Sequence, residues 1–169
     1  MSTAALLNSL YRHKAWANGE LYAEVARIDG GKHPEARHSA IRLLNHIFVV
    51  DRIFASHLQG RPHGYEATNT KETPTLEALT ADAAACDRWY VDYTAGVNDA
   101  ALAESLSFTF TDGLAGRMTR GEMLAHIVMH GSYHRGGVGR ILVSAERSPP
   151  RDLFTLHLHQ SEPARREIA

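Results

Sequence analysis

Apolar residues recur at helical spacing along most of the chain and mark out its long segments. The first segment covers residues 3–28 and is followed by the turn-forming sequence DGGKHP. The second covers residues 39–59, where Ser39 is a suitable N-cap and Gly60 ends the pattern. A polar, turn-rich loop then leads to a third segment, residues 74–96. The pattern therefore predicts three long helices in the first 96 residues.

The periodicity changes in residues 105–119, where apolar and polar side chains alternate around an Asp-Gly pair. Alternation interrupted by such a pair predicts a small β-hairpin. Thr119 and Glu122 then have the spacing of a capping box, which predicts that a fourth helix begins there and extends to about Val143. A short fifth helix is expected in residues 152–158.

The fold class that these elements predict is all-α. It is a four-helix bundle with a small β-hairpin inserted before the fourth helix. We find no internal repeat and no low-complexity tract, and a chain of 169 residues is long enough to bury one core. We therefore expect a single domain over residues 1–169.

Composition excludes several classes of partner. The chain has 18 Lys and Arg against 19 Asp and Glu, so no excess of positive charge attracts it to nucleic acid or anionic lipid. No apolar run is long enough to span a membrane, and the first residues lack the apolar core of a signal peptide. The single cysteine, Cys86, cannot form an internal disulfide, so we expect a cytoplasmic protein.

Histidine is the one unusual count, at 11 residues, and three of them recur in the segment HIVMHGSYHRGG. His126, His130 and His134 are spaced four residues apart. On a helix, residues four apart are separated by about 6 Å and about 40°, so two such imidazoles can converge on one metal ion. Residues eight apart lie about 12 Å from each other along the axis, which is too far for metal–nitrogen bonds of about 2.1 Å. The segment therefore offers one ligand pair.

The apolar side of the fourth helix selects between the two pairs. Met123, Ile127 and Val138 are on that side, and His130 and His134 point toward the bundle interior when each residue advances about 100°. We therefore predict His130 and His134 as the ligand pair. His126 falls at the margin of the apolar side.

A third ligand must come from a facing helix, and the second helix carries His46 and His57 near the edge of its apolar side. They lie roughly three turns apart, so only one can be level with the pair. Geometry favours His46, which is near the middle of its helix, without excluding His57. Spacing alone leaves a second interpretation equally open, in which these histidines are hydrogen-bonded residues with no metal.

Three segments carry a resemblance to a known family. YRHKAWAN, LLNHIFVVDRIFASHLQG and HIVMHGSYHRGG occur in the order found in the DinB/YfiT-like family of metal-dependent helical-bundle proteins, and the likeness extends over nearly the whole chain. The resemblance implies an up-down-down-up bundle that binds a divalent metal through His46, His130 and His134. One departure is that Tyr133 and Gly137 stand where relatives often have histidine and glutamine.

Three histidine ligands would leave a coordination position open, as in catalytic metal sites. Zinc and nickel both suit imidazole, and iron is a third candidate. The resemblance implies a metal-dependent thiol transferase or detoxification enzyme that takes a small-molecule substrate and a low-molecular-weight thiol as cosubstrate. Two alternatives are a hydrolase that uses metal-bound hydroxide and a non-enzymatic module that the metal stabilises.

The second helix also suggests an assembly. Val49 and Ile53 fall outside the sector centred on Ile47, and an apolar flank of this kind can be covered by a second copy of the chain. The alternative is that both residues pack under the first helix or the hairpin of the same chain. Because the resembling proteins commonly form two-fold dimers, we expect a homodimer.

Overall fold

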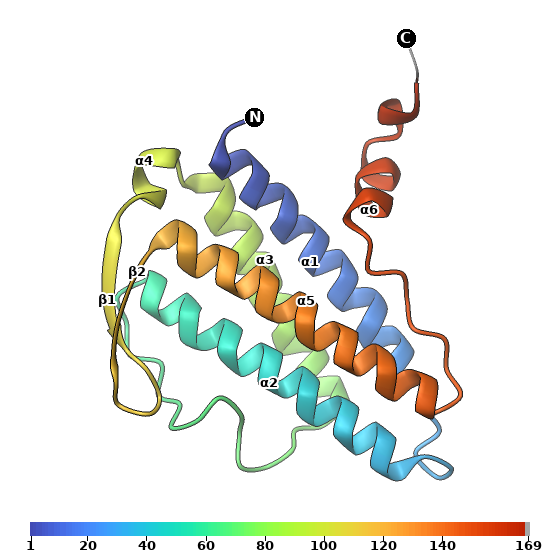
Figure 1. Ribbon diagram of the computed structural model, residues 1–169. Helices are drawn as coiled ribbons and strands as arrows, with labels where there is room; N and C mark the ends of the chain where they lie inside the picture. Colours follow the sequence, from blue (N-terminus) through green and yellow to red (C-terminus); the bar gives the residue numbers. More distant parts are fainter. Residues whose placement is uncertain (168–169) are drawn as a thin grey trace.

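Four long helices build the protein in the computed structural model, which describes residues 1–167. They are α1 (Thr3–Ala26), α2 (Pro34–Leu58), α3 (Leu76–Gly96) and α5 (Arg120–Ser144). Short elements lie between and after them: α4 (Asp99–Leu102), β1 (Ser105–Thr109), β2 (Ala115–Thr119), α6 (Phe154–Ser161) and the 3-10 turn η1 (Pro163–Arg166). The two strands pair antiparallel at one end of the bundle (Figure 1).

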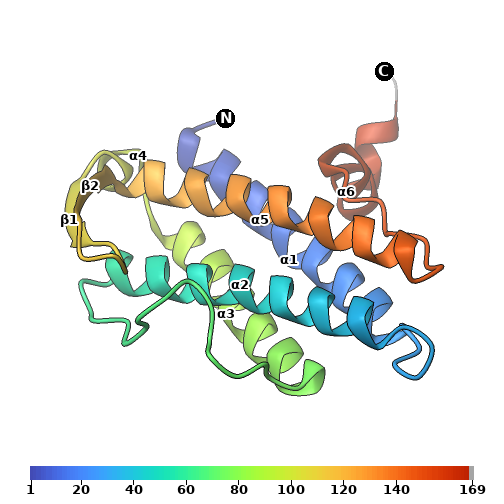
Figure 2. The same cartoon turned by 60° about the horizontal axis from the view of Figure 1, so that its bottom comes forward.

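The four long helices follow an up-down-down-up course, which confirms the predicted fold. α1 and α5 run in one direction, and α2 and α3 run in the other (Figure 1). The closest neighbours are α1 with α3 and α2 with α5. Each of these pairs is antiparallel, and Figure 2 shows that α2 and α5 lie side by side. The middle of α2 is therefore placed opposite the middle of α5.

The core between the helices has two buried apolar clusters, one toward each end of the bundle. Phe48 of α2 packs against both of them. The cluster toward the hairpin includes Tyr11, Phe54, Tyr90, Met123 and Ile127, and the other includes Leu21, Leu44, Leu79, Val138 and Leu142. No helix in residues 1–167 has the length and hydropathy needed to cross a membrane.

The helix starts agree with the sequence for α5 and differ for α2. The side chain of Thr119 accepts a hydrogen bond from the backbone of Glu122, whose carboxylate accepts one from the backbone of Thr119, so the predicted capping box is confirmed. α2 begins at Pro34, and Ser39 is not its N-cap but lies inside the helix. Proline suits the first helical turn because its backbone dihedral is already helical and it has no N–H to leave unpaired.

The expected apolar flank on α2 is wrong. Val49 is 0% exposed and Ile53 is 5% exposed, and both belong to the core cluster toward the hairpin. The inward sector of α2 is wider than the periodicity indicated, because α2 is covered by α5 and α3 and also contacts β1. These two residues therefore give no support to a homodimer, which remains a prediction.

Charged side chains also lie inside the bundle. Lys14 of α1 is 0% exposed, and its Nζ lies 2.6 Å from a carboxylate oxygen of Asp51 on α2 and 2.6 Å from one of Asp87 on α3. Asn18 donates a hydrogen bond of 2.8 Å to the other oxygen of Asp87. Burial opposes the charge of Lys14, but the two carboxylates outweigh it and raise its pKa. This buried charged layer ties α1, α2 and α3 together.

Candidate metal centre

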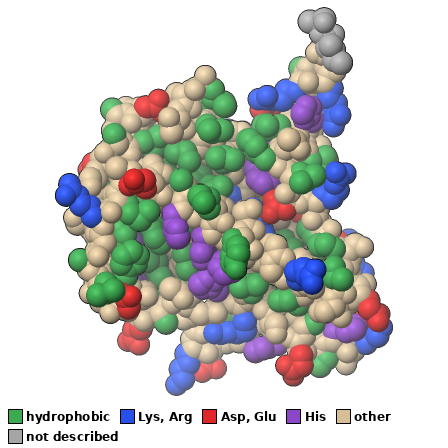
Figure 3. Space-filling view, viewed as in Figure 1, with side chains coloured by type: hydrophobic (Ala, Val, Ile, Leu, Met, Phe, Trp, Pro, Cys, Tyr) green, Lys and Arg blue, Asp and Glu red, His purple; other side chains and the backbone are tan. Residues whose placement is uncertain are grey.

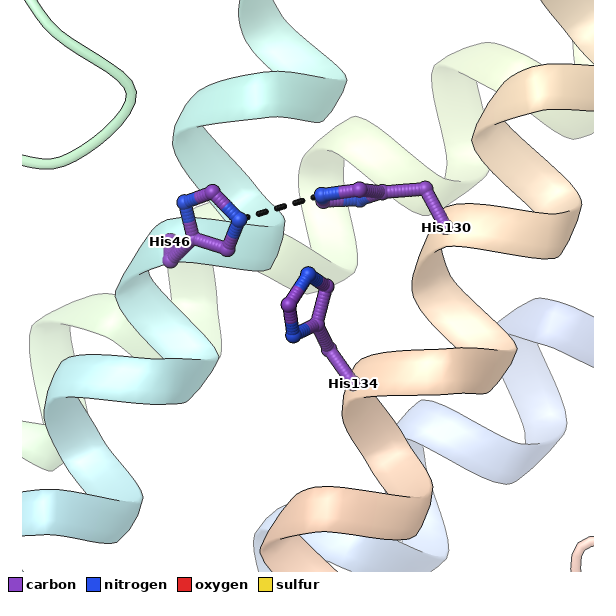
Figure 4. Close-up of side chains that lie close together, drawn as sticks. All are labelled: His46, His130 and His134. Atoms are coloured by element: carbon purple, nitrogen blue, oxygen red, sulfur yellow. Dashed lines mark hydrogen bonds between the residues drawn. The ribbon is translucent and has the colours of Figure 1, made fainter.

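The antiparallel packing of α2 against α5 brings three histidines together. His46 lies near the middle of α2, and His130 and His134 lie on consecutive turns of α5. Figure 4 shows that the two rings of α5 point across the helix interface toward the ring of His46. Each of the three side chains is partly buried. The structure thus places together the three residues that the sequence predicted as ligands.

The distances within the cluster suit a shared ion. One nitrogen from each ring can be chosen so that all three lie within 4.8 Å of one another. The Nε2 atoms of His46 and His130 are 3.0 Å apart. Two nitrogens bound to one ion at about 2.1 Å and a tetrahedral angle would lie about 3.4 Å apart, so the pair formed by His46 and His130 is already close to the spacing of metal ligands. The residues present therefore fit a metal ion, and the cluster could bind one.

A hydrogen bond orients the ring of His46 so that one of its nitrogens can bind a metal ion. Its Nδ1 lies 2.7 Å from the carbonyl oxygen of Thr68, in the loop between α2 and α3. A carbonyl oxygen can only accept, so Nδ1 carries the hydrogen and donates it. The lone pair of His46 is therefore on Nε2, which faces His130. A carbonyl that fixes the tautomer of a histidine in this way is a common support of metal ligands.

The surroundings of His130 and His134 favour the neutral forms of their imidazoles. Burial lowers the pKa of His130 to about 3, and repulsion from His134 and His46 adds to the effect. Burial and His46 also lower the pKa of His134. Metal ligation requires neutral imidazole with a free lone pair, and protonated neighbours would repel one another. The environment thus favours the protonation state that binds a cation.

The other two candidate histidines lie outside the cluster. His126 is exposed on α5, with its ring 5.6 Å from that of His130 between centroids. His57 lies near the end of α2, where its ring contacts those of Phe54 and Phe108. Over residues 1–167, no other group of three His, Cys, Asp or Glu side chains has metal-binding geometry. The structure therefore places His46, and not His57, next to His130 and His134.

Two supporting features had no clear signal in the sequence. The carbonyl of Thr68 belongs to the loop, and a backbone acceptor cannot be recognised from residue type. Arg135, next to His134 in the chain, has its side chain buried and its Nε 2.7 Å from a carboxylate oxygen of Asp152. The pair could not be predicted from the sequence, because Asp152 lies beyond the end of α5 and its position depends on the path that the chain takes there.

The chain was compared with known proteins over its whole length. A search of curated proteins finds no match to the chain. The sequence profile of the DinB family matches residues 1–165, which include all four long helices and the three clustered histidines. A match over nearly the full length shows the family, so the chain belongs to the DinB family.

Proposed function

We propose that the protein binds a divalent metal ion through His46, His130 and His134 and transfers a low-molecular-weight thiol to an electrophilic small molecule. The observation that carries the proposal is the cluster itself, in which three partly buried imidazoles each place a nitrogen within 4.8 Å of the other two. Three protein ligands leave a coordination position open for a substrate. Imidazole suits zinc, nickel and iron, so the donor set is compatible with each of them.

The thiol in this proposal comes from a cosubstrate. Cys86 is the only cysteine in the chain, and it is buried in α3. Burial, together with the nearby charge of Asp51, raises the pKa of its thiol to about 12. A thiol of this kind is not a nucleophile at neutral pH. A free buried cysteine also agrees with the reducing cytoplasm, which we propose as the compartment.

The proposed reaction is a substitution at an electrophilic carbon. A bound divalent ion supplies the positive charge that keeps a thiol deprotonated at neutral pH. The sulfur forms a new bond to carbon, the leaving group departs with its bonding electron pair, and the thiol proton passes to solvent. His46, His130 and His134 contribute neutral nitrogen ligands, with His46 held in the required tautomer by Thr68.

Ligand substitutions test the metal site. His130→Ala, His46→Ala and His134→Ala should each lose most of the bound metal, measured by plasma mass spectrometry on protein purified without a histidine tag. His126→Ala and His57→Ala should retain the metal. Stoichiometric metal in the His130→Ala protein would refute the assignment.

A conjugation assay tests the reaction separately. Metal-loaded protein should accelerate the loss of free thiol when a small thiol is mixed with chlorodinitrobenzene, and His134→Ala should abolish the acceleration. His159→Ala is the matched control, because this histidine lies on α6 and hydrogen-bonds only to Thr155 of its own helix. If the wild-type protein binds metal and conjugates none of a panel of thiols, the transferase part of the proposal is wrong.

The alternative is that the metal only stabilises the fold, and a melting experiment tests it. α2 and α5 already share the two apolar core clusters, so an ion is not the main contact between them. We therefore expect the metal-free protein to melt cooperatively and within a few degrees of the loaded protein. Loss of cooperative melting on chelation would instead favour the non-enzymatic module.

A further inference from the structure

A band of four rings leads away from the three-histidine cluster. It consists of Phe54 and His57 of α2, His126 of α5 and Phe108 of β1, and we call it the aromatic band. His126 is the member next to the cluster, 5.6 Å from the ring of His130. From His126 the rings continue to Phe54 at 4.9 Å, and from His57 to Phe108 at 4.7 Å, all between ring centroids.

The band lies on the same face of the molecule as the candidate metal centre. Figure 3 shows histidine side chains gathered on the face over α2 and α5, with hydrophobic side chains around them. On the outer side of α5, Met129 is 71% exposed and Tyr133 is 79% exposed. The ring of Tyr133 is 5.1 Å from that of His134. Large apolar side chains thus reach solvent beside the cluster without being covered by the rest of the chain.

The hairpin is built to place the ring of Phe108 in the band. In the antiparallel register Phe108 is opposite Gly116. A Cβ atom at Gly116 would lie 2.6 Å from the ring of Phe108 and 2.8 Å from that of Phe110, distances that no side chain tolerates. The absence of a side chain at Gly116 therefore lets the ring lie across the hairpin, where it packs against Phe54.

The band carries no formal charge at neutral pH. Burial lowers the pKa of His57, and the neighbouring His63 lowers it further, which favours the neutral form of its imidazole. The other members are two phenylalanines and a histidine. Phe54 is 6% exposed and belongs to the core, so the members of the band that reach solvent are His126, which is exposed, and His57 and Phe108, which are partly exposed. Neutral flat rings bind other flat rings by stacking and edge contacts.

We propose that the aromatic band binds the uncharged aromatic part of the electrophilic substrate and directs its reactive carbon toward His46, His130 and His134. The inference rests on the proposed function and adds the substrate class to it. His126 is the member of the band beside the cluster, so an aromatic ring that stacks on His126 would have one edge next to His130.

The experiment uses dinitrobenzene, which resembles an aromatic electrophile but has no leaving group and cannot react. Its affinity for the zinc-loaded full-length protein is measured by calorimetry, and the imidazole resonances of His57 and His126 are followed by NMR during the titration. Aromatic contacts are worth about 0.5–1.5 kcal/mol each, so Phe108→Ala should raise the dissociation constant by about 2- to 12-fold.

Two further variants control for folding. Gly116→Ala displaces the ring of Phe108 without removing it, and it should weaken binding in the same direction. Phe154→Ala removes a matched, partly buried phenylalanine from α6, on another part of the molecule, and should leave the affinity unchanged. All three variants should retain the wild-type metal content and circular dichroism spectrum.

The outcomes separate this inference from the proposed function. Equal affinity of the wild-type and Phe108→Ala proteins for dinitrobenzene would overturn the inference. Binding that leaves the resonances of both imidazoles unshifted would also overturn it, and so would the absence of binding up to the solubility limit of dinitrobenzene. Weakened binding in Phe108→Ala and Gly116→Ala supports the band even if no thiol is conjugated, in which case only the transferase fails. Where conjugation occurs, Phe108→Ala should lower kcat/KM for chlorodinitrobenzene and leave it unchanged for iodoacetamide, which has no ring.

Discussion

Removing the buried cation at Lys14 should destabilise the bundle more than any surface change. Lys14 lies between Asp51 and Asp87 at 2.6 Å from each, and its side chain is 1% exposed. Lys14→Met conserves most of the side-chain length and leaves two buried carboxylates without their partner. Breaking a buried ion pair from one side costs about 3–5 kcal/mol, because the remaining charge is neither paired nor hydrated. This is a large part of the roughly 5–15 kcal/mol that stabilises a typical domain.

Urea denaturation followed by circular dichroism measures the effect. We expect the free energy of unfolding of Lys14→Met to fall by about 3–5 kcal/mol, with a decrease in Tm of about 6–20 °C for a chain of this length. The measurement should be made on metal-free protein so that ion binding does not contribute. A loss below about 1 kcal/mol would refute the reasoning, since it would mean that the two carboxylates are neutral or hydrated without Lys14.

A combined variant separates charge from packing. Adding Asp51→Asn and Asp87→Asn to Lys14→Met removes the two unpaired charges and keeps side chains of the same shape. Replacing a buried charged group as a whole by neutral residues is often close to neutral in stability. The triple variant should therefore recover most of the loss. If it is no more stable than Lys14→Met, the lost contacts of the lysine stem, and not the carboxylate charges, dominate.

Two further predictions concern pH and assembly. Because the pKa of His130 is lowered from 6.5 to about 3, the folded metal-free protein binds fewer protons than the unfolded chain between these pH values, so its free energy of unfolding should fall as the pH decreases through that window. In the loaded protein, metal should be retained below pH 6.5 and lost before about pH 3; full retention at pH 3, measured after dialysis, would indicate other ligands. Light scattering at micromolar concentration should give twice the 18.7 kDa mass if the homodimer forms, and a monomer mass throughout would refute it.

The sequence was sufficient to predict the four long helices because each of them buries one face along most of its length. The capping box at Thr119 and the alternation in residues 105–119 both produced elements with the predicted starts. The start of α2 was missed because Pro34 and His33 carry no apolar period, and proline at a first turn can be read as a break. The width of its buried side was underestimated because periodicity cannot show how many neighbours cover a helix.

Some residues of the candidate site could be predicted from local sequence, and others depend on contacts between distant segments. His130 and His134 follow from one helix, since a spacing of four residues and the apolar side of α5 are local properties. His46 required the relative positions of two helices, and sequence geometry left His57 open until family resemblance was added. The aromatic band escaped notice because Phe108 reaches it through the hairpin, and Gly116 is informative only once the strand register is known.

The buried charges also explain why the rings of α5 point where they do. Arg135 follows His134 directly, and its side chain is held on the α1 side of the helix by Asp152 at 2.7 Å and by Asn18 at 3.5 Å. Successive residues differ by about 100° around a helix, so fixing Arg135 toward α1 turns His134 toward α2. Gly131, next to His130, is buried, and a Cβ there would lie 3.2 Å from the guanidinium of Arg135. The contacts of Arg135 with Asp152 and Asn18 therefore favour the rotation of α5 that turns His134 toward His46.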